Sequence, residues 1–233
     1  MNRWWWLAAV VAATRAQPLP SPILDETLNY AVNWPSGLSL GEAQSRAARL
    51  PAVDGQPERW EFRFSIEAAI PGFQVAERYR SVATAELCGL ELEKNSIRGK
   101  RKAIETTTFD ARRGVLTRAT SGGGGKSEVP IAACAKDGVT FLYHLRQQLR
   151  QGRIPSAQKV YLGAGYDLRF QYAGVQTLAI AGERIEADRL LATFKGPASE
   201  MTFEIFVARD EARTPVLIRA PLALGTFSLE LVR

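Results

Sequence analysis

Residues 60–66 read Trp-Glu-Phe-Arg-Phe-Ser-Ile, a strict alternation of large apolar and polar side chains. Because successive side chains of a β-strand point to opposite faces, the four apolar residues of this stretch share one face and the polar residues share the other. The same period of two recurs in Leu28-Tyr30-Val32-Trp34, Leu168-Phe170-Tyr172, Met201-Phe203-Ile205-Val207 and Phe227-Leu229-Leu231. This pattern is typical of an antiparallel sheet with one buried face and one solvated face.

One segment has the spacing of a helix instead. In residues 137–152 (DGVTFLYHLRQQLRQG), the apolar side chains Phe141, Leu142, Leu145 and Leu149 recur every three or four positions. Asp137 is suited to cap the start of this helix and Gly152 to end it. The sequence therefore predicts a mainly β fold in a single domain, residues 24–233. We expect an antiparallel wrapped sheet or incomplete barrel, with the helix at about 137–152 packed against its concave face.

The N-terminal residues have the pattern of an export signal. A basic start at Arg3 precedes the apolar run WWWLAAVVAA (residues 4–13), and Ala16 is a suitable cleavage residue. Spanning a bilayer takes about 20 apolar residues, so the run is too short for an anchor. We expect a signal peptide at 1–16, cleavage near Ala16/Gln17 and a Pro-rich leader at 17–23. The mature protein is then expected to be soluble, without stable transmembrane anchoring, in the periplasm or secreted.

Cys88 and Cys134 are the only cysteines of the chain. In an exported protein, such a pair most simply forms a disulfide, and two buried free thiols are the alternative. Together with the single histidine they cannot form a four-ligand zinc site, and we expect no metal and no cofactor. The segment 120–135 contains four consecutive glycines and is expected to be a mobile loop.

The chain has a formal net charge of +6, a mild excess that does not require a nucleic-acid partner. The densest positive run comprises Arg98, Lys100, Arg101 and Lys102. Such a run forms either a patch for anionic lipid or envelope polymer, or a solvated loop. We therefore expect no nucleic acid among the partners.

Residues 37–41 (GLSLG) match the G-x-S-x-G pattern of the nucleophile elbow in serine hydrolases. An envelope hydrolase using Ser39 with His144, the only histidine, is therefore one alternative. However, the elbow needs a strand, a strained turn and a helix, whereas a second strand is expected after this string. His144 is expected at the solvent-facing flank of the helix.

These observations favour a non-enzymatic envelope protein. It would bind a lipid, another apolar or amphipathic small molecule, or an envelope protein, and a purely structural or interaction module is the other alternative. The candidate lining residues are the large apolar side chains of the strands and of the helix, which could equally form a plain core. They are Trp34, Trp60, Phe62, Phe64, Phe141 and Leu145.

Four stretches together resemble a bacterial exported-protein family, the domain of unknown function 3108. They are 28–34 with Gly37, Leu40, Gly41 and Ala43; 108–110; 142–146 with Leu149 and Gly152; and Asp210, 214–218, Gly225 and Leu229. The resemblance covers roughly residues 25–231. It implies a curved antiparallel sheet partly wrapped around a helix, similar to periplasmic lipoprotein carriers. It also implies that the GLSLG string belongs to a hairpin, and it brings no catalytic residues.

Overall fold

The structure, a computed structural model, describes residues 25–53, 55–70, 73–122, 124–222 and 225–232. The expected signal peptide (1–16) and the Pro-rich leader (17–23) lie outside the described residues. No helix in these ranges is long and apolar enough to cross a membrane.

The described strands form one sheet of fifteen. In chain order they are β1 (Glu26–Asn33), β2 (Ser39–Leu50), β3 (Arg59–Ile70), β4 (Phe73–Thr84), β5 (Gly89–Arg98), β6 (Arg101–Asp110), β7 (Val115–Thr120), β8 (Lys126–Pro130), β9 (Lys136–Asp137), β10 (Gln158–Leu162), β11 (Ala164–Ile180), β12 (Glu183–Lys195), β13 (Glu200–Ala208), β14 (Pro215–Leu222) and β15 (Gly225–Val232).

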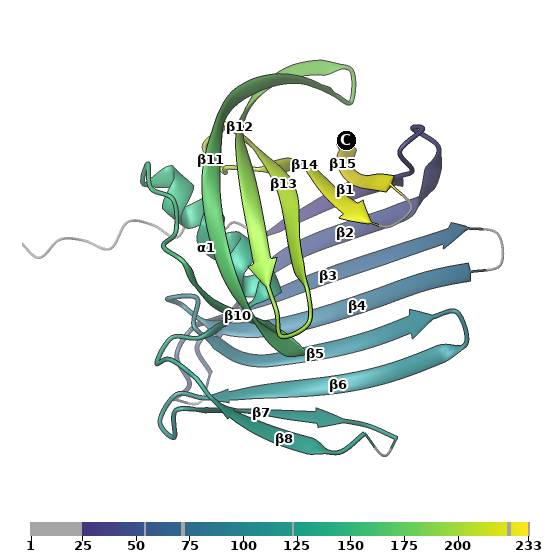
Figure 1. The fold of residues 1–233 in the computed structure, drawn as a ribbon. Helices are drawn as coiled ribbons and strands as arrows, with labels where there is room; N and C mark the ends of the chain where they lie inside the picture. The colour runs from purple at the N-terminus through teal and green to yellow at the C-terminus, as the bar shows by residue number, and fades with distance from the viewer. Residues whose placement is uncertain (1–24, 54, 71–72, 123, 223–224, 233) are drawn as a thin grey trace, which may run out of the picture.

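Two meanders meet side by side in this sheet, because the first strand, β1, pairs with the last, β15. Every pairing is antiparallel except that of β9 with β10, which confirms the predicted mainly β, antiparallel fold. Figure 1 shows β3–β8 as a broad curved slab, with the long strands β11–β13 arching in front of it. We refer to these two parts as the slab (β3–β8) and the arch (β11–β13).

The single helix among the described residues, α1 (Gly138–Arg150), is close to the predicted range. Asp137 caps it as expected, accepting hydrogen bonds from the backbone N–H groups of Val139 and Thr140. At the other end Gly152 has a φ of +69°, and its N–H donates to the carbonyl of Leu149. The next N–H, of Arg153, donates to the carbonyl of Gln148, so the helix ends in a Schellman motif.

Helix α1 buries two sides of its surface at once. On the slab side, the ring of Tyr143 stacks on Phe62 with centroids 4.2 Å apart, and Phe62 in turn stacks on Trp60. On the arch side, Phe141, Leu145 and Leu149 pack into a second cluster with strands β10–β13. The helix therefore lies against the concave face of the sheet, as predicted, and fills one end of its interior.

The segment before the helix brings distant strands of the sheet together. Cys134 forms a disulfide with Cys88, and the N–H of Gly89 donates to the carbonyl of Ala135 at 2.9 Å. Two residues later, Asp137 pairs with Tyr161 of β10. Strand β5 is thus connected to β10 through this segment, at the helix end of the molecule, although the sheet is not closed into a barrel.

The carboxyl group of Asp137 is completely buried where these elements meet. One oxygen accepts the two backbone N–H groups at the start of α1, and the other accepts the hydroxyls of Ser81, at 2.6 Å, and Thr140, at 2.9 Å. Because Ser81 belongs to β4, this carboxyl group connects the slab to the helix.

The Gly-rich segment 120–135, expected to be a loop, contains a strand. Glycines occupy the turn after β7, where Gly122 and Gly125 have positive φ values of +77° and +80°. Beyond the turn, β8 pairs with β7 at the edge of the sheet, and all five of its side chains are exposed. Its side chains lie in solvent, where Glu128 interacts with Thr117 and Arg113, so the strand carries no apolar alternation that would predict it.

Removing the disulfide should destabilise the fold without changing its topology. The bond spans 46 positions, and the chain-entropy model gives roughly 4 kcal/mol for a loop of that size. We expect the double variant Cys88→Ala/Cys134→Ala to lose about that much free energy of unfolding in urea titrations. An unchanged unfolding midpoint, or a wild-type intact mass without the loss of two hydrogens under non-reducing conditions, would contradict this expectation.

The Asp137→Ala variant should lose about 3 kcal/mol of unfolding free energy, because it leaves several buried donors without an acceptor. A matched control is Asp110→Ala, since Asp110 also accepts two backbone N–H groups, from Arg112 and Arg113, but in a solvated turn. There water can replace the carboxyl group, so we expect a loss of about 1 kcal/mol or less. Equal losses in the two variants would contradict a special role for the buried carboxyl group.

Candidate ligand-binding cavity

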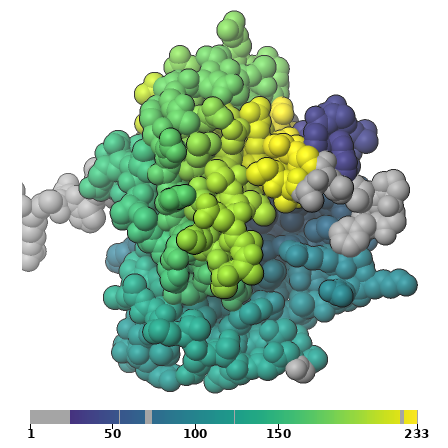
Figure 2. Space-filling model, viewed as in Figure 1, coloured from purple at the N-terminus to yellow at the C-terminus, as the bar shows by residue number. Residues whose placement is uncertain are grey.

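A cavity of about 470 Å³ lies in the part of the interior that α1 leaves unfilled. Its volume falls within the range of small-molecule sites, about 300–1,000 Å³. The slab, the helix and the arch all contribute residues to it. Figure 2 shows the yellow-green strands β12 and β13 in front of the slab. Its lining is mostly aromatic and aliphatic: Phe64, Tyr79, Val139, Leu142, Leu162, Tyr166, Phe194, Met201, Phe203, Ile205 and Ile218, with Ser45, Lys94, Arg98, Gly138 and Ser199.

The alternation of the strands explains why this lining is apolar. Along the inward face of β3, Trp60 and Phe62 lie under the helix and are almost completely buried, whereas Phe64 lies one step beyond it and is half-buried. From the opposite wall, Phe194 and Phe203 contact each other edge to face, with centroids 5.3 Å apart. The cavity therefore continues the hydrophobic core past the end of the helix.

A polar group lies beside this apolar surface, on β4 and β5. The hydroxyl of Tyr79 donates to one oxygen of Glu77, and Nε of Arg98 donates to the other at 2.7 Å. Burial alone would raise the pKa of Glu77, but the hydrogen bonds from Tyr79 and Arg98 and the charge of Arg98 lower it below its ordinary value. Glu77 is thus a carboxylate held by two partners.

Burial and the hydrogen bond to Glu77 raise the pKa of Tyr79, whose phenol therefore stays protonated. The ammonium group of Lys94 lies 5.7 Å from the centre of the Tyr79 ring, in the range of a cation–π contact. The cavity wall therefore combines aromatic surface with two cationic side chains, Lys94 and Arg98.

The structure places the six candidate lining residues in different surroundings. Phe64 lines the cavity. Trp60 and Phe62 are buried between slab and helix, and Phe141 and Leu145 are buried between helix and arch. Trp34 contacts the ring of Phe227, with centroids 4.9 Å apart, and lines a separate hollow.

Sequence reasoning did not identify Lys94, Tyr79 or Leu142 as lining residues. Phe203 belongs to the alternating stretch 201–207, so its inward direction was predicted, but its place in the cavity was not. The available signal was the period of two around Lys94, which places its side chain on the same face as the buried Leu92.

The four cations of the basic run 98–102 differ in their partners. Lys100, Arg101 and Lys102 are exposed around the turn between β5 and β6. Arg98 is also exposed, but it binds Glu77 and lines the cavity, which the other three do not. The run is therefore not a single patch of four equivalent cations.

Ser39 and His144 lie in unrelated positions. Ser39 is exposed at the start of β2, in a hairpin instead of a strand–turn–helix elbow. A Cβ atom on Gly41 would lie 2.0 Å from the carbonyl oxygen of Glu67, so this glycine is required by the close approach of β3. Within the described ranges, no hydrogen bond connects Ser39 with His144.

His144 is half-buried instead of solvent-facing, because it packs edge to face against Phe141 on the helix. Its Nδ1 atom is buried without a hydrogen-bond partner among the described residues. Burial, and secondarily the charge of Lys136, lower the pKa of His144 from 6.5 to about 4.

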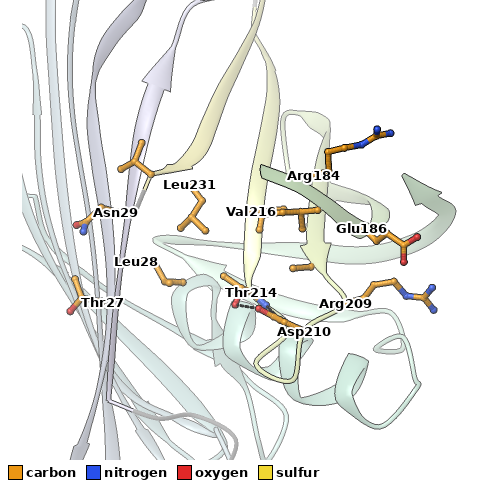
Figure 3. A pocket seen from close by; sticks show the side chains of 13 residues that line it. Thr27, Leu28, Asn29, Arg184, Glu186, Arg209, Asp210, Thr214, Val216 and Leu231 are labelled. Atoms are coloured by element: carbon orange, nitrogen blue, oxygen red, sulfur yellow. Dashed lines mark hydrogen bonds between the residues drawn. The ribbon is translucent and has the colours of Figure 1, made fainter. Parts of the chain in front are cut away.

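A second hollow, of about 710 Å³, lies on another part of the molecule and is more polar (Figure 3). Asp210 turns back onto Thr214 and accepts hydrogen bonds from its N–H and its hydroxyl. Figure 3 shows Arg184, Glu186 and Arg209 together on one side, across from Thr27 and Asn29. Because the lining of the first cavity is mostly aromatic and aliphatic, whereas this hollow is lined by several charged side chains, we regard the first cavity as the candidate site.

The single histidine provides a pH-dependence test. Between about pH 4 and 6.5, the folded protein keeps His144 neutral whereas the unfolded chain binds the proton. The free energy of unfolding should therefore fall as the pH decreases from 6.5 to about 4, and His144→Gln should remove this part of the dependence. The imidazole NMR signal belongs to one residue, so a titration midpoint near 6.5 would contradict the burial described above.

Comparisons with known proteins agree with this fold. A search of curated proteins found no match. A crystal structure described as a beta-barrel-like protein of domain of unknown function DUF1849, from Brucella abortus, is similar with a TM-score of 0.61 and 7% identity, covering 89% of this chain and 95% of that one. At this identity the similarity concerns the fold alone. The model of the family described as a protein of unknown function, DUF3108, matches residues 29–232, and the chain therefore belongs to the DUF3108 family.

Proposed function

We propose that this protein is a non-enzymatic binder of an apolar or amphipathic small molecule in the cell envelope, and that the ligand lies in the cavity between slab and arch. The observation that carries the proposal is a cavity of ligand size lined by half-buried aromatic and aliphatic side chains. Covering such surface is favourable by about 25 cal/mol for each Å² of apolar area removed from water.

The arrangement of the interior supports a bound molecule over a catalytic centre. The hydroxyl of Ser45 is hydrogen-bonded to the hydroxyl of Tyr143 at 2.9 Å, and the phenol of Tyr79 donates its hydrogen bond to Glu77. His144 and Ser39 are not among the residues that line the cavity. What the cavity offers a ligand is therefore apolar surface with a cationic edge.

The expected export signal fits this role. An apolar or amphipathic molecule in an aqueous compartment outside the cytoplasm needs a protein interior that shields its chain from water. The disulfide is also consistent with an oxidising compartment.

Filling the cavity with a larger side chain tests this proposal. Leu142 of α1 and Met201 of β13 line the cavity from different walls, and both are half-buried. We expect delipidated wild-type protein to bind the neutral fluorophore N-phenyl-naphthylamine in a saturable manner. Leu142→Trp and Met201→Trp should each weaken this binding by at least about tenfold, because the indole occupies the space of the ligand.

The matched control is Leu38→Trp, since Leu38 is 66% exposed and is not a lining residue of the cavity. It should bind the fluorophore as the wild type does. Circular dichroism and urea unfolding establish that each variant is folded. A wild-type protein without saturable binding, or folded cavity variants that bind normally, would overturn the proposal.

A protein partner is the second candidate, favoured by one observation. Strand β8 lies at the edge of the sheet with all of its side chains exposed, and such an edge can accept a strand from a partner. Native mass spectrometry of protein purified gently from the envelope separates the two. A lipid-sized adduct supports the small-molecule proposal, and a bare chain that crosslinks through β8 to another protein supports the partner.

A further inference from the structure

We propose that the ligand is a single-chain amphiphile with an anionic headgroup, and that Lys94 binds this headgroup while the chain lies among the aromatic residues of the cavity. This inference rests on the function proposed above and adds the chemical class of the ligand. It follows from the charges on the inward face of the slab.

The inward face of β5 changes from apolar to basic along the strand. Leu92 is buried in the cluster that contacts the helix, whereas Lys94 and Arg98, on the same face, line the cavity. Cationic side chains therefore lie beyond the helix-filled end of the interior, next to the surface that Phe64 and Tyr79 offer to a chain.

Each of the two carboxylates on this face is matched by a guanidinium group. Arg98 and Tyr79 together occupy both oxygens of Glu77. On the neighbouring strands β6 and β7, Arg118 binds both oxygens of Glu105, with Nε at 3.0 Å and Nη2 at 2.8 Å. Two carboxylates and two guanidinium groups thus neutralise each other.

Lys94 does not belong to either of these ion pairs. Its direct neighbours across the sheet are Tyr79 on β4 and Glu105 on β6, but the oxygens of Glu105 are held by Arg118. In the described parts of the chain Lys94 has no ion pair, and its ammonium group lies over the ring of Tyr79. Arg101, which pairs with Arg98 in the strand register, is a fourth cation of this face, but it is exposed and does not line the cavity. Of the two cations that line the cavity, Lys94 is therefore the one without a carboxylate partner.

This position suits the headgroup of an amphiphile. A cation–π contact leaves the N–H donors of the ammonium group available, and a half-buried charge interacts with an anion more strongly than an exposed one because the local dielectric constant is lower. A cationic headgroup would be repelled, and a neutral one would not compensate the charge. The shared chemistry of the ligand is thus an alkyl chain with a carboxylate or a phosphate.

The test compares amphiphiles that differ only in the headgroup. Dodecanoate, dodecyl phosphate, dodecanol and dodecyltrimethylammonium are titrated, below their micelle concentrations, into delipidated protein containing N-phenyl-naphthylamine, and displacement is measured. We expect the two anions to bind about tenfold more tightly than dodecanol, and the cation to bind more weakly than dodecanol. The tighter of the two anions identifies a carboxylate or a phosphate as the preferred headgroup.

Lys94→Gln should remove the preference for the anions, so that dodecanoate and dodecyl phosphate bind no more tightly than dodecanol does. The matched control is Lys102→Gln, which removes the same charge from the neighbouring strand. Lys102 pairs with Ile97, is exposed and is not a lining residue, so the control should keep the preference. Circular dichroism checks that both variants are folded.

Each outcome has a defined meaning. Equal affinity for anions and dodecanol, or an anion preference that persists in Lys94→Gln, overturns this inference and leaves the proposed function intact. Displacement by inorganic phosphate or acetate as effective as by the amphiphiles also overturns it, because the site would then bind a free anion. If wild-type protein binds neither the fluorophore nor any amphiphile, the proposed function fails and this inference fails with it.

Discussion

The buried carboxyl group of Asp137 is the interaction on which the arrangement of this fold depends. It accepts hydrogen bonds from the start of α1 and from Ser81 of β4, while its own backbone pairs with β10. A carboxyl group without partners in this position would be very unfavourable, because burial raises its pKa and penalises the charged form. The helix, the slab and β10 must therefore all be in place for this group to be satisfied, and the disulfide three residues earlier holds the same segment to β5.

The cavity is a consequence of this geometry. A helix of 13 residues fills one end of an interior that strands of up to 17 residues enclose, and the remaining space is lined by whatever residues alternate inward there. Near the helix these residues are packed against it, as Phe62 is against Tyr143. Farther along they are half-buried, as Phe64 is, and then charged, as Lys94 and Arg98 are. The apolar lining and the cationic edge of the cavity are therefore neighbouring parts of one surface.

Local sequence signals predicted the elements well. The period of two identified the antiparallel strands, and the spacing of Phe141, Leu145 and Leu149 with the caps Asp137 and Gly152 identified the helix. These signals work because side-chain direction and capping depend on residues close in the chain. Strand β8 was not predicted, because its side chains are exposed on both faces. The half-buried position of His144 was not predicted either, because it depends on how residues pack around the helix.

The sequence by itself determined that this chain forms an antiparallel sheet with one helix, and which side chains face inward, because these properties are set within a few residues. Only the tertiary structure decided which inward residues are core and which line a cavity. Trp60, Phe62 and Phe64 belong to one alternating stretch, yet α1 covers the first two and leaves the third half-buried. Likewise, the sequence around Lys94 is typical of a solvated strand. Its charge is left unpaired because Arg98 binds Glu77 and Arg118 binds Glu105, an arrangement that only the folded sheet brings about.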